Sequence, residues 1–473
     1  MADISKPILY TLYGGYLFDA SFQMLFLSTL VALVAWYILR QPNSKEKPLS
    51  KSEEEELIEE FQPEELIPEA NPEILASRKR VVTSKAGKYI TIDGTTCLNL
   101  ATHNYLSFID NPDVESNTSA SISKYGVGSC GPRGFYGTVD VHLDLEEKLA
   151  EYMEVEEACV YSYGFATIAS AIPAYAKRGD IVFVDQAVNF AVQKGLDASR
   201  SVVRYFKHND MADLERLLKE QQKEDLKNPK KASRTRKFLI AEGIYLNTGV
   251  ICNLPELVKL RKEYKLRMIL DESVSFGTLG ATGKGVVEYF GIPNIEVDLR
   301  IGSMEGSLAS IGGFCCGASF IVEHQRLSGL GYCFSASLPP MLAVAALTSL
   351  DHMKNKPELF SKLKEVSQML HKHLLTLTEY KVGGDPDSPI KHLYIKEDLD
   401  FSKKKKILKD IVQFCIEHNV AVVSPDYLTE IEKFPIEPSL RLTANVDISE
   451  KEIKTAVAVL SDAYESCISS ESS

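Results

Sequence analysis

Hydrophobic and polar positions alternate in short blocks through the middle of the chain. Apolar runs of four or five residues are followed by stretches with apolar residues at helical spacing. The predicted strands are 181–185, 202–206, 238–241 and 266–270, and the predicted helices are 189–199, one that starts after Asp210, and 254–264. This order predicts βαβ units and a mostly parallel sheet with helices on both faces. Ligands bind such sheets beyond the carboxyl ends of the strands, where Asp185, Glu242 and Asp271 fall.

The N-terminal part carries a long apolar run. The eighteen residues 22–39 carry no charge, and a helix of that length rises about 27 Å, close to the hydrocarbon thickness of a bilayer. Arg40 and several lysines follow the run, whereas only Lys6 precedes it, and this bias places the rest of the chain in the cytosol. Residues 1–50 are therefore predicted to be a membrane anchor with a transmembrane helix at about 22–39. A buried helix of a globular domain and a helix lying in the membrane interface stay open as alternatives.

The remaining sequence divides into three parts. Residues 51–95 are predicted to be an acidic linker with one short helix and the N-terminal strands, which lie near 89–92 and 97–100. Residues 96–341 are the predicted large domain, in which Asp144 and Glu147 resemble a capping box at the start of a helix. Residues 342–473 are predicted to be a smaller α+β domain, with helices at 357–377, 402–417 and from 449, and strands at 393–395, 420–423 and 440–443. The tail from Ile468 is expected to be disordered.

Composition narrows the classes of function. Among 473 residues, 45% are hydrophobic and 25% are charged, which is ordinary globular composition. The net charge of -12 argues against nucleic acid as the main partner. Nine cysteines are spread singly apart from Cys315 and Cys316, with no CxxC pair and no Cys/His cluster at metal spacing. We therefore expect reduced thiols facing the cytosol and no metal site.

One absence bears directly on chemistry. Lys354 is the only lysine between Gly285 and Asn355, and residues 299–314 lie inside this gap, after a strand that ends at Asp271. In one large enzyme class, a strand-end aspartate pairs with the pyridinium nitrogen of pyridoxal phosphate (PLP), and a lysine some tens of residues later forms a Schiff base with it. Here the aspartate is present and the amine is missing. The chain is therefore expected to be built like a PLP enzyme that cannot run the chemistry alone.

Four segments resemble the α-oxoamine synthase family of PLP enzymes, which condense an amino acid with an acyl-CoA. They are 125–138 (YGVGSCGPRGFYGT), 161–167 (YSYGFAT), 277–286 (GTLGATGKGV) and 332–340 (YCFSASLPP). The resemblance covers about residues 50–465. It implies an α/β fold of the fold-type I PLP-dependent transferases (aminotransferase-like), with a mostly parallel central sheet and a smaller C-terminal α+β domain.

The resemblance also implies that the catalytic positions of the family are altered here. Asp271 matches the aspartate of the ring nitrogen and is expected to be vestigial. Phe190 and Val274 stand where catalytic members carry histidines, and Gly306 aligns with the Schiff-base lysine. Valine cannot relay a proton, and Lys284, the nearest lysine upstream, matches an ordinary basic residue of the family. No catalytic residue is therefore expected on this chain.

Family members are dimers with active sites at the subunit interface, so a degenerate copy can complete a partner's site. Ser335 and Ser337 match the segment that reaches the opposite chain's PLP phosphate, and a plain turn before two prolines is the alternative. Arg441 matches the arginine for the substrate carboxylate and is expected to be a relic that pairs with a nearby acid. A Gly-rich loop matches the loop at the site mouth and interface, and its alternative is a structural turn with a buried cysteine. The residues of this loop expected to face a partner or its substrate are Cys130, Gly131, Arg133, Phe135 and Tyr136.

The resemblance thus implies a catalytically silent subunit that forms a heterodimer with a lysine-bearing second subunit, which binds PLP. The joint reaction would condense L-serine with palmitoyl-CoA to 3-ketosphinganine, the entry step of sphingolipid synthesis, at the endoplasmic reticulum membrane. Small regulatory membrane subunits and membrane lipid are the further expected partners. Two alternatives stay open: an active PLP-dependent synthase that uses an atypical base, and a non-enzymatic regulatory scaffold.

Overall fold

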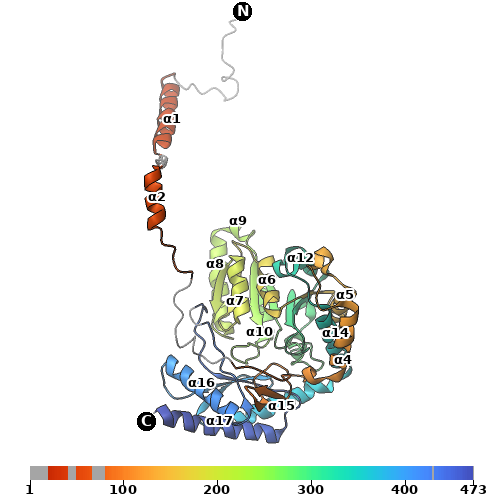
Figure 1. Ribbon diagram of the computed structural model, residues 1–473. Coiled ribbons are helices and arrows are strands. Elements are labelled where there is room, and N and C mark those ends of the chain that lie inside the picture. Colours follow the sequence, from red (N-terminus) through yellow and green to blue (C-terminus); the bar gives the residue numbers. More distant parts are fainter. Residues whose placement is uncertain (1–19, 41–48, 67–79, 429–430, 472–473) are drawn as a thin grey trace, which may run out of the picture. The chain divides into compact units, whose positions relative to one another are not determined.

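The N-terminal unit contains two helices. The computed structural model describes residues 20–40, 49–66, 80–428 and 431–471, and the chain divides into two units, 1–78 and 79–473. The first unit holds α1 (Ala20–Arg40) and α2 (Lys51–Glu60) (Figure 1). Helix α2 is the short helix expected in the acidic linker, and a capping box of Ser50 and Glu53 starts it.

Helix α1 contains the apolar run, and its described apolar side chains are exposed, for example Leu27 and Trp36. Among the described residues, no helix combines the length and the apolar character that crossing a membrane requires. The predicted transmembrane helix is thus not found there. Lys6, on which part of the predicted orientation rested, lies outside the described residues.

A seven-stranded sheet lies at the centre of the second unit. Its strand order is β3-β9-β8-β7-β6-β4-β5. Strands β8, β7, β6, β4 and β5 are parallel, and β9 is antiparallel to both of its neighbours. Every residue of β4 is buried, as expected for a parallel strand covered on both faces. The strands are β3 (Glu157–Tyr161), β4 (Ile181–Asp185), β5 (Val202–Phe206), β6 (Lys237–Glu242), β7 (Arg267–Asp271), β8 (Leu299–Ser303) and β9 (Gly313–Gly317).

Helices connect the strands of the large sheet, and the predicted helices are among them. Figure 1 shows α6, α7 and α8 grouped apart from α4, α5 and α14. Asp210 caps α8 as predicted, since its side chain accepts a hydrogen bond from the Asp213 amide. The predicted capping box at Asp144 is wrong, because α5 begins one turn earlier and the His142 ring bonds to the Val139 amide at 3.2 Å. The helices are η2 (Phe108–Asp110), α4 (Pro112–Tyr125), η3 (Arg133–Gly137), α5 (Asp140–Met153), α6 (Gly164–Tyr175), α7 (Phe190–Ser199), α8 (Met211–Lys227), α9 (Pro229–Ala232), α10 (Leu254–Glu263), α11 (Val286–Tyr289), η4 (Asn294–Glu296), α12 (Ser319–Ser328), α13 (Leu330–Cys333) and α14 (Pro340–Asn355).

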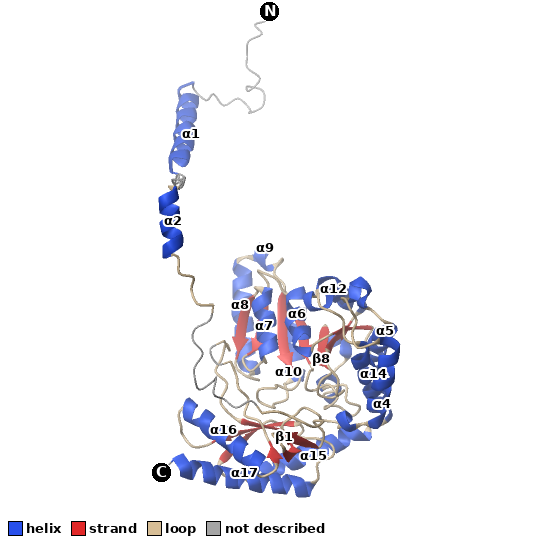
Figure 2. Cartoon of the chain, in the orientation of Figure 1, coloured by secondary structure: helices blue, strands red, loops and turns tan. Residues whose placement is uncertain are grey.

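Two small sheets and the helices α15, α16 and α17 form a smaller part of this unit, which combines residues 89–99 with the C-terminal residues (Figure 2). Strand β2 pairs in parallel with β12, with Leu98 opposite Val420, so strands from the start and the end of this unit share one sheet. The expected disordered tail is wrong for residues 468–471, because α17 continues to Glu471. The elements are β1 (Tyr89–Ile92), β2 (Thr95–Asn99), β10 (Tyr380–Gly383), β11 (Ile390–Ile395), β12 (Val420–Ala421), β13 (Leu440–Thr443), α15 (Glu358–Leu374), α16 (Phe401–Glu417) and α17 (Glu450–Glu471).

Candidate functional site

A cavity of about 280 Å³ lies beyond the carboxyl ends of the parallel strands. Phe190, Asp271, Val274 and Gly306 all line it. Four positions that the sequence singled out therefore come together in space, at the edge where ligands of α/β sheets bind. The other lining residues are His103, Tyr105, Gly164, Phe165, Ile168, Asn189, Ala191, Leu246, Ser273, Ser303 and Glu305.

Asn189 joins the two buried acids beside the cavity. Its side-chain amide donates to the Asp271 carboxylate at 2.9 Å, and its backbone N–H donates to Glu242 at 2.5 Å. Its side-chain oxygen accepts from the Val192 amide and caps α7. Burial raises the pKa of Asp271, and burial together with the Asp271 charge raises the pKa of Glu242 to about 8. Asp185, the third strand-end acid, instead accepts from the amide of Ala187 in the turn after β4 and from the amide of Asn209 after β5.

The position of Gly306 is closed by an aromatic side chain. A Cβ atom built on Gly306 would lie 2.7 Å from Cε2 of Tyr105, which is nearly fully buried. The Tyr105 hydroxyl is 2.6 Å from Nδ1 of His103. Burial, with the nearby charge of Arg441, lowers the pKa of His103 to about 3, so this ring is neutral at physiological pH. The place of a Schiff-base lysine thus carries no amine and has no room for one without a shift of Tyr105.

Phe190 and Val274 give the cavity apolar walls. The Phe190 ring faces the Phe165 ring, with 6.3 Å between the centroids. Lys194 Nζ lies 4.8 Å from the Phe190 ring centroid but pairs with Asp197 at 2.9 Å. No lysine is among the described residues that line the cavity. Neither Phe190 nor Val274 carries a group that can transfer a proton.

The other lysine weighed from the sequence lies elsewhere. Lys284 Nζ pairs with Glu154 and lines a separate pocket with Lys148 and Asp351. An ion-paired ammonium outside the cavity cannot attack a ligand bound in it. The structure therefore agrees with the interpretation of Lys284 as an ordinary basic residue.

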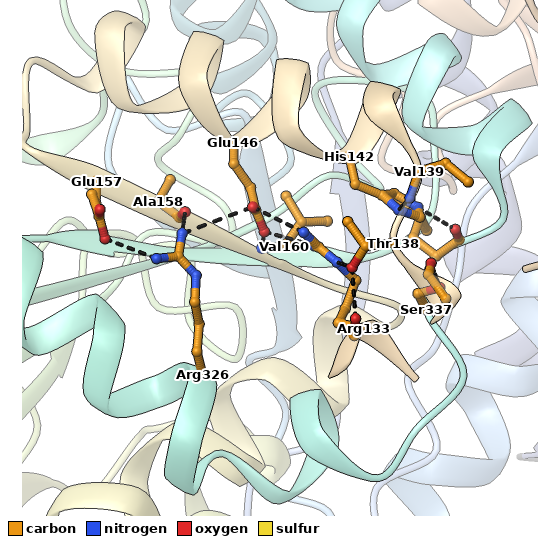
Figure 3. A network of polar contacts seen from close by, with 12 residues as sticks. Arg133, Thr138, Val139, His142, Glu146, Glu157, Ala158, Val160, Arg326 and Ser337 are labelled. Atoms are coloured by element: carbon orange, nitrogen blue, oxygen red, sulfur yellow. Dashed lines mark hydrogen bonds and ion pairs between the residues drawn. The ribbon is translucent and has the colours of Figure 1, made fainter. Parts of the chain in front are cut away.

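Arg133 is a structural residue of the Gly-rich loop (Figure 3). Its guanidinium makes a bidentate ion pair with Glu146 on α5, at 2.7 and 3.0 Å, and Nε donates to Thr138 Oγ1 at 2.9 Å. Both charged side chains are almost fully buried. Glu146 also accepts from the Val160 amide at 2.8 Å and lies 3.8 Å from Arg326. The expectation that Arg133 meets a partner or its substrate is corrected, because every face of this guanidinium is turned into the fold.

Three other residues of this loop are open to solvent. Cys130 is exposed and has a left-handed φ of 56°, so the alternative of a buried cysteine is wrong. Phe135 and Tyr136 are 67% and 103% exposed. Gly131 and Gly137 let the two ends of the loop meet, since a Cβ on Gly137 would lie 1.9 Å from the Gly131 carbonyl oxygen. The loop thus exposes two large aromatic side chains to solvent, while the backbone at its two ends is in close contact.

The two serines expected to reach a partner differ in their environment. Ser337 is buried, and its hydroxyl donates to the carbonyls of Gly131 and Gly137. Its backbone N–H also donates to Gly131 at 2.9 Å. Ser337 therefore fastens the Gly-rich loop and has no hydroxyl proton left for a phosphate. Ser335 is partly exposed, and its hydroxyl makes only a local 3.3 Å contact with the Ala336 carbonyl.

Arg441 lies on β13, partly buried near the His103 and Tyr105 wall. Burial lowers its pKa. Within the described part of the chain its Nε has no hydrogen-bond partner and no acid lies within ion-pair distance. The expected ion pair of Arg441 is not seen among the described residues, and its role stays a prediction.

Three functional positions escaped the sequence analysis. Asn189 was predicted only as a helix start, although an N-cap residue shortly after the strand-end Asp185 could have indicated that it contacts the strand-end acids. Tyr105 precedes the sheet by some fifty residues, and no local pattern links it to Gly306. Glu305 stands in the lysine-free run itself, and an acid among small residues there was the available signal.

Comparison with known proteins agrees with the fold. The family model for aminotransferase class I and II matches residues 95–460. Serine palmitoyltransferase 1 of Dictyostelium discoideum is 40% identical over 471 residues, 97% of each chain. Long chain base biosynthesis protein 1 of Arabidopsis thaliana is 36% identical, covering 91% of this chain and 89% of that protein.

Solved structures show the same architecture. A serine palmitoyltransferase from S. paucimobilis, with a bound PLP–myriocin aldimine, has a TM-score of 0.74 and 24% identity and covers 83% of this chain and 93% of that one. An 8-amino-7-oxononanoate synthase from Francisella tularensis has a TM-score of 0.63 and 20% identity, covering 78% and 97%. These likenesses support the aminotransferase-like fold with its mostly parallel central sheet.

The described cavity residues do not fit PLP as a cofactor of this chain. Asp271 lies where a pyridine nitrogen could meet it, but it is already bonded to Asn189 and to the Ser273 amide. The amine is absent, and the Glu305 carboxylate lies beside Gly164 at the start of α6. A helix N-terminus is the natural place for a phosphate, and a carboxylate there repels one. No reaction step through PLP is therefore assigned to this chain.

Proposed function

The chain belongs to the aminotransferase class I and II family, and from this premise we propose that it is the non-catalytic subunit of a serine palmitoyltransferase. Its role is in the synthesis of sphingolipid long-chain bases, by condensation of L-serine with palmitoyl-CoA to 3-ketosphinganine. The observation that carries the non-catalytic role is Gly306 itself, which brings no amine to the cavity and where an added Cβ would lie 2.7 Å from the Tyr105 ring. Loss of a covalent nucleophile costs several orders of magnitude in rate, and none of the described residues that line the cavity is a lysine that could replace it.

The partner in this proposal is a lysine-bearing homologous subunit, serine palmitoyltransferase subunit 2, which binds PLP and carries out the bond-making steps. In this proposal, this chain contributes residues to the interface with that subunit. Phe135 and Tyr136 are exposed, and large aromatic side chains are favoured at the centres of protein interfaces. Ser335, whose hydroxyl makes only a local contact with the Ala336 carbonyl, is the serine that we assign to the partner's PLP phosphate. Ser337 and Arg133 serve by holding the loop in shape.

We further propose that the complex works at the endoplasmic reticulum membrane, with the second unit in the cytosol. The described apolar side chains of α1 are exposed, and an exposed apolar surface of this kind marks a site of contact with a membrane or a protein. Palmitoyl-CoA is amphipathic, so a site held close to a bilayer meets its substrate where that substrate partitions. Small regulatory membrane subunits are the further partners of this proposal.

Co-expression with a lysine-bearing homologue tests the function. The account predicts serine incorporation into a long-chain base by the pair and by neither chain alone. Turnover by this chain alone would instead support an active synthase with an atypical base. Unchanged turnover of the homologue with and without this chain would support a regulatory scaffold. Removal of α1 should lower the recovery of activity in the membrane fraction without abolishing assembly.

A further inference from the structure

A basic segment without acids leads from the end of α8 to the first residue of β6. Six of the eleven residues 227–237 are lysine or arginine and none is acidic, although the whole chain has a net charge of -12. Helix α9 lies in this segment and carries two exposed lysines, Lys230 and Lys231. At physiological ionic strength, charges in solvent act over only about 8 Å. The local positive charge, rather than the net charge of the chain, therefore decides what this surface attracts.

Four of the six basic side chains have no acid of this chain beside them. Arg236 pairs with Asp180, and Lys237 pairs with Asp225. Glu224, the other acid at the end of α8, pairs with Arg204. The remaining four are exposed and have no ion-pair partner in the part of the chain that the structure describes: Lys227, Lys230, Lys231 and Arg234. Because the nearby acids are already engaged, an anion from outside has to balance these charges.

Exposed apolar side chains lie beside this segment. Leu226 directly precedes it, and Phe320 stands in the first turn of α12; both are exposed. A hollow of about 370 Å³ is lined by Arg236 and Phe320, so α12 and the end of the basic segment share one surface. A second hollow is lined by Phe320 and by the exposed Ile295. Figure 1 shows α9 and α12 at the same end of the second unit, away from α16 and α17.

We propose that this surface docks onto an anionic lipid bilayer. We call it the basic face and define it by its exposed side chains: Leu226, Lys227, Lys230, Lys231, Arg234 and Phe320. Lysine and arginine are attracted to anionic headgroups, and apolar side chains beside them enter the acyl boundary to a depth of about 5–10 Å. RNA would use the same charges and could stack on Phe320, but it offers no apolar phase to Leu226 and Ile295. The inference rests on the proposed membrane location and adds a second contact to that of α1.

The single tryptophan of the chain allows a contact probe at the basic face. Trp36→Phe combined with Phe320→Trp leaves the full-length chain with one tryptophan, at the proposed contact. Vesicles contain brominated phosphatidylcholine, alone or with about 30% phosphatidylserine, and the bound chain is isolated by flotation. Bromine quenches tryptophan only at close range, so attachment through α1 alone does not produce the signal. Leu375→Trp in the same background is the control, at an exposed apolar residue after α15.

With phosphatidylserine present, the tryptophan at position 320 should lose about half of its fluorescence, because its ring enters the acyl boundary. The loss should be small without phosphatidylserine, and small for the control in both lipids. Lys230→Gln with Lys231→Gln should lower the equilibrium constant of the contact about thirtyfold and abolish the quenching. Lys356→Gln with Lys372→Gln removes the same charge at two other exposed lysines and should not. If circular dichroism shows that the Phe320→Trp chain is unfolded, Leu226→Trp takes its place.

Four results would overturn the inference. The first is equal quenching in neutral and anionic vesicles, and the second is no quenching in either. The third is quenching that survives the change of Lys230 and Lys231. The fourth is a labelled single-stranded RNA that binds the wild type at micromolar concentration and loses affinity with the same change, since it would assign the face to nucleic acid. Serine incorporation in detergent solution needs no bilayer, so an active complex without quenching refutes only this inference. An inactive complex with quenching refutes only the proposed function.

Discussion

The buried ion pair of Arg133 and Glu146 offers the sharpest test of how the partner-facing loop is held. Arg133→Ala removes a guanidinium that makes two bonds to Glu146 and one to Thr138. The Glu146 carboxylate would stay buried, with only the Val160 amide as a close donor and Arg326 at 3.8 Å. A buried charge left without its partner is strongly unfavourable, because it has lost its hydration without compensation.

Breaking such a pair costs about 3–5 kcal/mol. The remaining contacts of Glu146 place the expected cost at the lower end, about 3 kcal/mol. The second unit spans residues 79–473, and a unit of that size has an unfolding entropy of about 0.8 kcal/mol per kelvin near its midpoint. The expected fall in Tm is therefore about 4 °C.

Thermal unfolding followed by circular dichroism measures this shift, with Arg216→Ala as the control. Arg216 pairs with Asp213 and Glu220 on an exposed helix face, and such pairs are worth about 0–1 kcal/mol. The double change Arg133→Ala and Glu146→Gln should recover about 1 °C of the loss, because no buried charge remains. A Tm for Arg133→Ala within 1 °C of the Arg216→Ala value would refute the reasoning, as would a double variant no more stable than Arg133→Ala.

Three further changes test other parts of the account. Gly137→Ala should destabilise the chain by about 2 kcal/mol, because the new Cβ would meet the Gly131 carbonyl oxygen. In the control Gly134→Ala the new Cβ enters open space, so Tm should change little. Equal melting temperatures of the two variants would contradict this. Burial and the charge of Asp271 raise the pKa of Glu242 to about 8, so the folded state holds more protons than the unfolded state above about pH 5, and stability falls as pH rises toward 8. Glu242→Gln should make the fall in Tm between pH 5.5 and pH 8 smaller, and an unchanged fall would refute the assignment. Tyr136→Ala should leave Tm unchanged but weaken binding of the lysine-bearing subunit about tenfold, measured by titration, whereas the control Phe320→Ala, at another exposed aromatic residue, should not.

Periodicity predicted the second unit well because its strands and helices carry strong local signals. Residues 181–184 are continuously apolar, and together with Asp185 they form a fully buried strand. Asp210 and Asn189 cap helices where the sequence placed helix starts. Asp144 misled because it lies inside α5, where the helix start is fixed instead by the contact of His142 with the Val139 amide.

Long-range contacts explain what the sequence could not provide. The sequence did not show that Arg133 faces the core. Its ion-pair partner, Glu146, lies thirteen residues away on another element, and both side chains are buried. Ser337 resembled a phosphate ligand but bonds to a loop two hundred residues earlier. The pairing of β2 with β12 joins segments more than three hundred residues apart. The cavity, by contrast, was foreseen in part, because strand-end positions converge in any parallel sheet.

The location of the cofactor in an active complex tests the central claim most directly. The complex with the lysine-bearing subunit is incubated with PLP, reduced with borohydride, digested and mapped by mass spectrometry. The account predicts a pyridoxyl adduct on a partner lysine in proportion to activity, and none above background on this chain, including at Lys194 and Lys284. A stoichiometric adduct on this chain that rises with turnover would contradict it.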